Sequence, residues 1–194
     1  IIKYQGNSTS GAKVPHGLSG VDFLIVKGTI NGNSGDTNWR VYHKDIGATN
    51  NLKLNSTQAA EDDSSRWNDT EPTSTVFSLG NHASTNETGY TYIAYCWHSV
   101  PGYSAFGHYT GVVSGKPFIY TGFKPAWVMI KGTDVAVSGS TNLGSYQGWS
   151  IFDTARDDYN PSKLPLYANA AYTEGLAGNG SGTAGASVGG IDIV

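Results

Sequence analysis

The sequence predicts an all-β protein, an antiparallel β-sandwich of the jelly-roll type made of two related repeats. Short strand-like runs recur along the chain, and clusters of Gly, Asn, Asp and Ser separate them. Helix signals are scarce, because Met occurs once and no long stretch spaces its apolar residues at i, i+3, i+4 and i+7. A set of strand-like runs from the first half also returns in the second half in the same order. Short strands with such punctuation are typical of sandwiches and jelly rolls.

Six runs carry the strand prediction. The first is apolar and rich in β-branched and aromatic residues, which is typical of a buried strand. The second and third alternate, so successive side chains should point to opposite faces of a sheet. In the third run, Tyr95 and Trp97 should share one face, and Cys96 and His98 the other. The six runs are Val21–Lys27, Asn38–His43, Thr91–His98, Phe118–Thr121, Ala126–Lys131 and Trp149–Phe152.

The two halves of the chain share four blocks in one order. Two blocks are long: Phe23-Leu24-Ile25-Val26-Lys27-Gly28-Thr29 aligns with Trp127-Val128-Met129-Ile130-Lys131-Gly132-Thr133, and Trp39-Arg40-Val41-Tyr42-His43 aligns with Trp149-Ser150-Ile151-Phe152-Asp153. Two are shorter: Leu52-Lys53-Leu54-Asn55 aligns with Leu166-Tyr167-Ala168-Asn169, and Tyr4-Gln5-Gly6 with Tyr109-Thr110-Gly111. Chance similarity between strands is the alternative, but four blocks in the same order favour a true repeat.

The repeat divides the chain into residues 1–105, a first β-sandwich repeat, and residues 106–194, a second one. The second repeat has no counterpart of Thr75–Leu79 or of Thr91–His98 before the sequence stops at Val194. We therefore expect the second repeat to be cut short at its C-terminal end. The two repeats can form separate domains or two halves of one sandwich, since a unit of about 100 residues is near the small end of domain sizes.

Composition excludes several classes of protein. Only 14% of the 194 residues are charged and 12% are aromatic, a balance opposite to that of disordered chains. The net charge of −3 argues against nucleic-acid binding, which needs a basic surface to displace counterions from phosphates. The longest apolar runs are far too short to cross a bilayer, so we expect no membrane insertion. The single Cys96 leaves no internal disulfide and no Cys-rich zinc site.

Several strings resemble a repeat found in virion proteins of tailed, often marine, bacteriophages. They cover nearly the whole chain, and they keep their order. The strings are Val14-Pro15-His16-Gly17-Leu18, Phe23–Lys27, Trp39–His43, Gly89–His98 running into Pro101-Gly102-Tyr103-Ser104, and Tyr120–Lys131. The resemblance implies a concanavalin-like β-sandwich in a tail fibre, a spike or a head-surface protein. It brings no catalytic residues, because the matching positions are mostly core and turn residues.

Carboxylate and thiol candidates point to structural roles. A glycoside hydrolase needs two carboxylates about 5–9.5 Å apart, and no strand-like run carries a suitably spaced pair. Glu61-Asp62-Asp63 is expected to be a solvated turn rather than a cation site, and Asp153 with Arg156, Asp157 and Asp158 a surface ion-pair network. Cys96 and His98 share a strand face, but the thiol lies in an apolar run, so we expect a packed core cysteine rather than a nucleophile. We therefore predict no catalytic residues, no metal and no cofactor.

Aromatic residues outside the strands are the better candidates for a binding site. Sugar rings stack on flat aromatic rings, and binding residues often lie on loops held by a rigid scaffold. Trp67, Tyr103 and Phe106 are the candidate ligand-binding residues on this ground. The alternative is that these rings close the ends of the sandwich or pack against another subunit.

The predicted function is that of a non-enzymatic structural protein on the exterior of a phage virion, with host-surface glycans as candidate ligands. We expect its partners to be other virion subunits, with a homo-oligomeric assembly, and its location to be the virion, assembled in the host cytoplasm. One alternative is a carbohydrate-active enzyme or its accessory sugar-binding module. The other is a capsid decoration protein without a ligand. A fold alone does not separate these functions.

Overall fold

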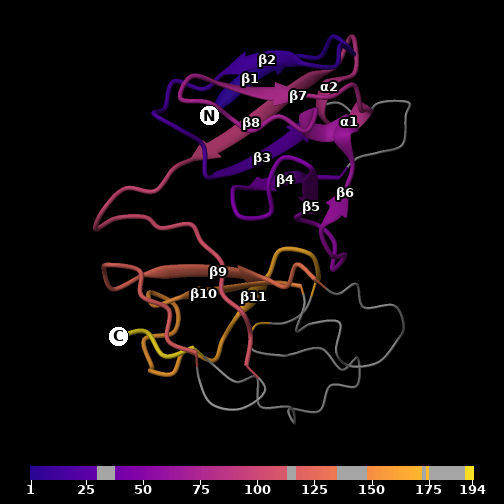
Figure 1. Cartoon of the computed structure of the whole chain (residues 1–194). Helices are drawn as coiled ribbons and strands as arrows, with labels where there is room; N and C mark the ends of the chain where they lie inside the picture. Colours follow the sequence, from indigo (N-terminus) through magenta and orange to yellow (C-terminus); the bar gives the residue numbers. More distant parts are fainter. Residues whose placement is uncertain (30–37, 113–116, 135–147, 172–173, 175–190) are drawn as a thin grey trace. The chain divides into compact units, whose positions relative to one another are not determined.

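The computed structural model describes residues 1–29, 38–112, 117–134, 148–171, 174 and 191–194, which form two compact units. Unit 1 comprises Ile1–Lys53 and Ala60–Phe123, and unit 2 comprises Leu54–Ala59 and Lys124–Val194 (Figure 1). The boundary predicted between residues 105 and 106 concerns the sequence repeat and stays a prediction. None of the helices in the described part of the chain is long and apolar enough to cross a membrane.

Unit 1 is an all-β sandwich, as the sequence predicts. Its larger sheet has six strands in the order β1-β8-β3-β4-β5-β6, and its smaller sheet pairs β2 with β7; all pairings are antiparallel. The strands of unit 1 are β1 (Ile2–Gln5), β2 (Ala12–Pro15), β3 (Phe23–Gly28), β4 (Arg40–His43), β5 (Asn50–Lys53), β6 (Glu61–Asp62), β7 (Val76–Leu79) and β8 (Thr91–Trp97). Two short helices, α1 (Ser64–Trp67) and α2 (Ala83–Asn86), complete the unit.

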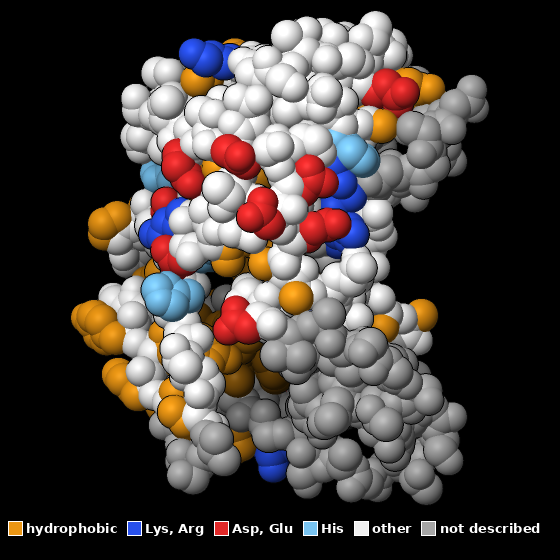
Figure 2. Space-filling model, turned by 45° about the vertical axis from the view of Figure 1, so that its right-hand side comes forward, with side chains coloured by type: hydrophobic (Ala, Val, Ile, Leu, Met, Phe, Trp, Pro, Cys, Tyr) orange, Lys and Arg blue, Asp and Glu red, His pale blue; other side chains and the backbone are white. Residues whose placement is uncertain are grey.

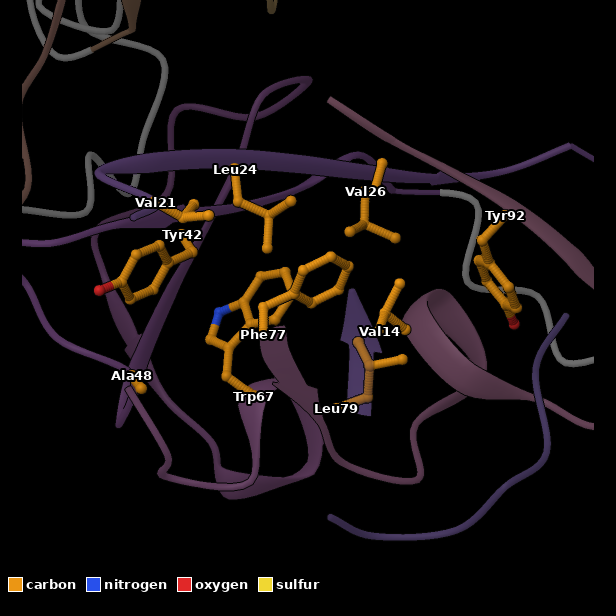
Figure 3. Packing of buried hydrophobic residues seen from close by; sticks show 11 residues of the cluster. Val14, Val21, Leu24, Val26, Tyr42, Ala48, Trp67, Phe77, Leu79 and Tyr92 are labelled. Carbon is orange, nitrogen blue, oxygen red and sulfur yellow. The ribbon is translucent and has the colours of Figure 1, made fainter. Parts of the chain in front are cut away.

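The core of unit 1 lies between the two sheets (Figure 3). Leu24 and Val26 of β3 project from the larger sheet, and Val14, Phe77 and Leu79 face them from the smaller one. All five side chains are less than a tenth exposed, so their burial drives the two sheets together.

The alternation predicted for the third run is present in β8. Tyr92 and Ala94 belong to the core cluster, and Cys96 packs against it, whereas Tyr95 and Trp97 lie on the opposite face of the sheet. The alternation in β4 follows the same rule, with Tyr42 in the core and His43 on the other face beside Phe23. The sheet therefore has a core face and a second face, and both carry large side chains.

Helix α1 was not predicted, because one helical turn is too short for a periodic pattern. Asp63 caps it: its side chain accepts the Ser65 N–H at 2.9 Å, as an N-cap residue does. The helix packs directly on the end of β7, since a Cβ at Gly80 would lie 2.1 Å from the Ser65 carbonyl oxygen. Only glycine fits there.

Unit 2 contains the three-stranded sheet β11-β10-β9, again antiparallel. Its strands are β9 (Trp127–Lys131), β10 (Trp149–Asp153) and β11 (Leu166–Tyr167). The sequence blocks predicted to match are paired in one register. Phe23 lies opposite His43 as Trp127 lies opposite Asp153. Val41 lies opposite Leu52 as Ile151 lies opposite Leu166.

The turn after the second matched strand is also shared. In unit 1 the His43 Nδ1 accepts the Asp45 N–H at 3.2 Å, and in unit 2 the Asp153 carboxylate accepts the Ala155 N–H at 2.8 Å. Different side chains therefore stabilise the same turn in the two units. These agreements support the repeat between β3–β5 and β9–β11, while the extent of the full repeat stays a prediction.

The strand predicted at Phe118–Thr121 is absent. No strand of the described residues pairs with this segment, and Phe118, Ile119 and Tyr120 are 77%, 48% and 84% exposed. Its aromatic and β-branched residues favour an extended chain, but a strand also needs a partner to bond its backbone. Local propensity alone therefore gave a wrong prediction here.

Candidate functional site

Five rings form a continuous row on the second face of the six-stranded sheet. Tyr95 stacks on Trp39 with centroids 6.5 Å apart and on Trp97 at 6.2 Å. Phe23 contacts Trp97 at 5.6 Å and stacks on Phe106 at 5.7 Å. We call these five residues the aromatic row.

Strand pairing places the aromatic row on this face. Tyr95 lies directly opposite Ile25, and Trp97 opposite Phe23, and cross-strand partners point to the same side of a sheet. The residues that alternate with Phe23 and Ile25 along β3, Leu24 and Val26, enter the core. Phe23, Tyr95 and Trp97 are therefore held by two central, fully paired strands, and Trp39 and Phe106 pack against these rings from outside the strands.

Exposure varies along the row. Trp97 is 41% exposed, Trp39, Tyr95 and Phe106 are half-buried, and Phe23 is buried at 6%. The indole of Trp97 therefore offers the largest open ring surface, while Phe23 supports the rings on either side of it. Flat rings with open faces are suited to the C–H faces of a sugar, because the ring face carries partial negative charge.

Polar side chains flank the row. The Lys27 ammonium lies 5.7 Å from the centroid of the Trp39 ring, a cation–π contact. The His43 ring packs edge-on against Phe23 at 6.1 Å. Burial lowers the pKa of His43, although Asp45 opposes that shift, so the imidazole is neutral at pH 7. The row thus combines ring faces with hydrogen-bonding groups.

The three predicted ligand-binding residues have different positions. Trp67 lies in the core cluster at 2% exposure, edge-on to Tyr42 at 6.3 Å, so no ligand reaches its ring in the folded protein. Its position is the packing role that the sequence left as the alternative (Figure 3). Tyr103 is 80% exposed on the turn after β8, which the Val100 and Ser104 backbones close at 2.9–3.0 Å. Phe106 belongs to the aromatic row.

The acidic cluster after β5 serves the fold. Glu61 accepts from the buried Arg40 Nη1 and from Lys53 Nζ, both at 3.3 Å. Burial opposes the shift, but Lys53 and Arg40 hold the pKa of Glu61 below its usual value. Asp63 caps α1 and pairs with Arg66 at 3.1 Å. Across the described residues, no group of three or more His, Cys, Asp or Glu side chains is placed to hold a metal ion.

The second acidic cluster also has structural contacts. Asp153 pairs with Arg156 at 3.8 Å, and Arg156 reaches Glu174 as well. Asp157 accepts the backbone N–H groups of Lys163 at 2.6 Å and Leu164 at 3.0 Å, which fixes the turn between them. The predicted pairing of Asp153 with Arg156 is present. The prediction of a surface ion pair is wrong for Asp157, which is buried at 4% exposure and anchors a turn through backbone N–H groups.

The Cys96 thiol is not arranged as a nucleophile. It packs against the core cluster, and burial raises its pKa to about 11, which keeps it protonated at neutral pH. The His98 Nδ1 lies 2.9 Å from the Ser99 carbonyl oxygen rather than on the thiol. The predicted packed cysteine therefore agrees with the structure.

Acidic side chains lie on the face of unit 1 that Figure 2 turns towards the viewer. Exposed carboxylates of unit 1 include Glu61, Asp62, Asp69 and Glu71, in the segment from β6 through the residues after α1. An acidic surface repels the phosphates of nucleic acids and agrees with the net charge of −3.

A family model described as a domain of unknown function, DUF7483, matches residues 1–184. The chain belongs to this family. The match runs through unit 1 and most of unit 2, so a DUF7483 domain contains both units rather than one. Comparisons of the chain with curated proteins and with solved structures found no match.

The DUF7483 fold shows which site residues the sequence analysis missed. Trp39, Tyr95 and Trp97 lie in predicted strands, and the sequence pattern assigned each ring only to one face of a sheet. Candidate ligand-binding residues were predicted only in loops. Alternation separates the two faces of a strand, but it does not say which face is open. The signal was present in the alternation of the two predicted runs, which puts Tyr95 and Trp97 on one face of β8 and Trp39, just before β4, in step with His43.

Proposed function

We propose that this chain is a non-enzymatic structural protein on the exterior of a phage virion and that the aromatic row binds host-surface glycans. The observation that carries the binding proposal is the row itself, five rings in contact on a face formed by paired strands. The resemblance of the sequence blocks to phage virion repeats supports the location. Other virion subunits, including further copies of this chain, are the proposed partners.

The physics of glycan recognition favours such a surface. Strands β3 and β8 are each paired on both sides, so the rings are positioned before a ligand arrives and lose little conformational entropy on binding. The row would bind mainly through its ring faces, so a single site should bind weakly. Many copies on one particle convert weak sites into strong attachment, because the second and later contacts are intramolecular.

The alternative of a carbohydrate-active enzyme has less support. Among the described residues, the carboxylates of Asp22, next to Phe23, and of Asp45, two residues after His43, each have a partner already. Asp22 accepts the Ser99 N–H at 2.6 Å and lies 3.7 Å from Lys44, and Asp45 lies 3.1 Å from His108. Burial would raise the pKa of Asp22, but Ser99 and Lys44 lower it, whereas a general acid needs a raised pKa.

The test is cryo-electron microscopy of the intact particle that carries this chain, followed by an array of bacterial surface polysaccharides. The proposal expects the chain on the particle exterior with Trp97 open to solvent, and saturable binding on the array. Trp97 and Tyr95 buried at contacts between subunits would instead support a decoration protein without a ligand. Absence from the particle, together with cleavage of an array glycan, would support the enzyme.

A further inference from the structure

The sheet face that carries the aromatic row continues onto β1. Tyr4 of β1 packs against the core cluster, so Lys3 and Gln5 on either side of it lie on the same face as the row. Lys3 lies directly opposite Ile93, which is two residues from Tyr95 along β8. The surface beside the rings therefore includes polar side chains of β1.

Two lysines lie on either side of β8 on this face. Ile93 is opposite Lys3 of β1 and also opposite Lys27 of β3. Neighbouring strands are about 4.8 Å apart, so the two lysine backbones are separated by about 10 Å, and Tyr95 lies about 7 Å further along β8. The Lys27 ammonium lies 5.7 Å from the centroid of the Trp39 ring. A ligand that covers Tyr95 is therefore within reach of both ammonium groups.

The carboxylates near the row lie at its other end. Strands β1, β3 and β8 contain no Asp or Glu. Lys3 is exposed, and within the described part of the chain no carboxylate pairs with it. Beside Phe23, by contrast, Asp22 lies 3.7 Å from Lys44. The β1 side of the row is therefore the side suited to a negatively charged group.

A polar pair extends this surface past the lysines. The Gln5 Nε2 donates to the Thr91 Oγ1 at 2.9 Å, and the two residues lie opposite each other on β1 and β8. The Gln5 side chain is exposed, and its carbonyl oxygen is an acceptor for hydroxyl groups such as those of a sugar. Rings, ammonium groups and hydrogen-bonding groups thus follow one another along β8.

We propose that the glycan bound by the aromatic row is an acidic polysaccharide, whose repeating sugars carry carboxylate or phosphate groups, and that Lys3 and Lys27 bind one such group. The inference rests on the proposed glycan binding and specifies its substrate class. One sugar covers the Tyr95 and Trp97 rings, and the acidic group of a neighbouring sugar accepts charge-assisted hydrogen bonds from the lysines. The net charge of −3 disfavours nonspecific binding of a polyanion, so the attraction depends on this local pair.

The probes are two pairs of polymers that share a backbone within each pair and differ in charge. Polygalacturonate is compared with its methyl-esterified form, and dextran phosphate with dextran. Binding to the full chain is measured by isothermal titration calorimetry. We expect an acidic polymer to bind more tightly than its neutral partner, and this preference to disappear at about 1 M salt, where charges are screened within about 3 Å. The pair that shows the preference identifies the acidic group as carboxylate or phosphate.

Substitutions of Lys3 test the site. Lys3→Gln should weaken binding of the acidic polymer by about twofold to fivefold at low salt and leave binding of the neutral polymer unchanged. Lys3→Arg keeps the charge and should retain the affinity. Lys13→Gln is the matched control and should have no effect, because Lys13 is an exposed lysine of β2 that alternates with the core residue Val14 and so lies on the outer face of the smaller sheet.

Three results would overturn the inference. The first is equal affinity for each acidic polymer and its neutral partner, which would leave the glycan proposal standing with a neutral ligand. The second is unchanged affinity for Lys3→Gln, or a loss equal to that of Lys13→Gln, which would mean that this site does not select the charge. The third is binding of none of the four polymers, and only an array without any bound polysaccharide would overturn the glycan proposal as well.

Discussion

Replacing Trp97 with alanine is the sharpest test of the aromatic row. Trp97 is 41% exposed, and a tryptophan side chain offers roughly 150–250 Å², so about 60–100 Å² is open to a ligand. At about 25 cal/mol per Å², covering this area contributes about 1.5–2.5 kcal/mol. Trp97→Ala should therefore weaken glycan binding by roughly tenfold to sixtyfold in Kd.

The assay is isothermal titration calorimetry with the polysaccharide that gives the strongest signal on the array. Trp127→Ala is the matched control, because Trp127 is 53% exposed and lies in unit 2, outside the aromatic row. It removes as much open aromatic surface without touching the proposed site. A urea unfolding curve for each variant confirms that the fold is kept.

Two outcomes would refute the reasoning. Equal losses of glycan affinity for Trp97→Ala and Trp127→Ala would mean that glycans bind to any exposed aromatic side chain and not specifically to the aromatic row. Unchanged affinity for Trp97→Ala, with a normal urea midpoint, would remove the row as the binding surface. In that case Tyr103→Ala becomes the informative variant, because Tyr103 is 80% exposed on the turn after β8.

Three further predictions concern the fold. Trp67→Ala should cost about 3–5 kcal/mol of unfolding free energy in urea, because it empties a core position that is 2% exposed; a cost as small as that of a surface substitution would contradict the core placement. The pKa of Glu61 is lowered in the folded state, so its stabilising contribution is present above its unfolded pKa and is lost as pH falls through the folded pKa. The urea midpoint should therefore fall on acidification and fall less in Glu61→Gln, whereas equal slopes would exclude the ion pairs with Arg40 and Lys53 as the cause. Iodoacetamide should modify Cys96 at pH 8 far more slowly than free cysteine, because its pKa is raised to about 11; an equal rate would mean that the thiol is open and ionised.

Sequence patterns predicted correctly which side chains share a face of a strand and which strands are equivalent in the two units. Alternation separated Tyr92 from Tyr95 correctly, because the pleat of a strand imposes a period of two whatever the strand packs against. The matched blocks predicted strands that pair in one register, since similar side-chain patterns select similar pairings.

Long-range structure limited the rest of the prediction. Phe118–Thr121 has the composition of a strand and no partner among the described residues, and pairing depends on segments far away in the chain. Trp67 was assigned to a loop, and a one-turn helix instead directs it into the core, although the Asp63 cap was a readable signal. The aromatic row depends on three elements meeting across β3, which no local pattern encodes.

The matched strands of the two units can be compared at the positions of the aromatic row. Trp127 and Asp153 of unit 2 correspond to Phe23 and His43, which pack together in unit 1. Two of the five rings in the row come from β8, and the described residues of unit 2 have no counterpart of that strand. Among the described residues, the contacts that β8 contributes to the aromatic row therefore belong to unit 1.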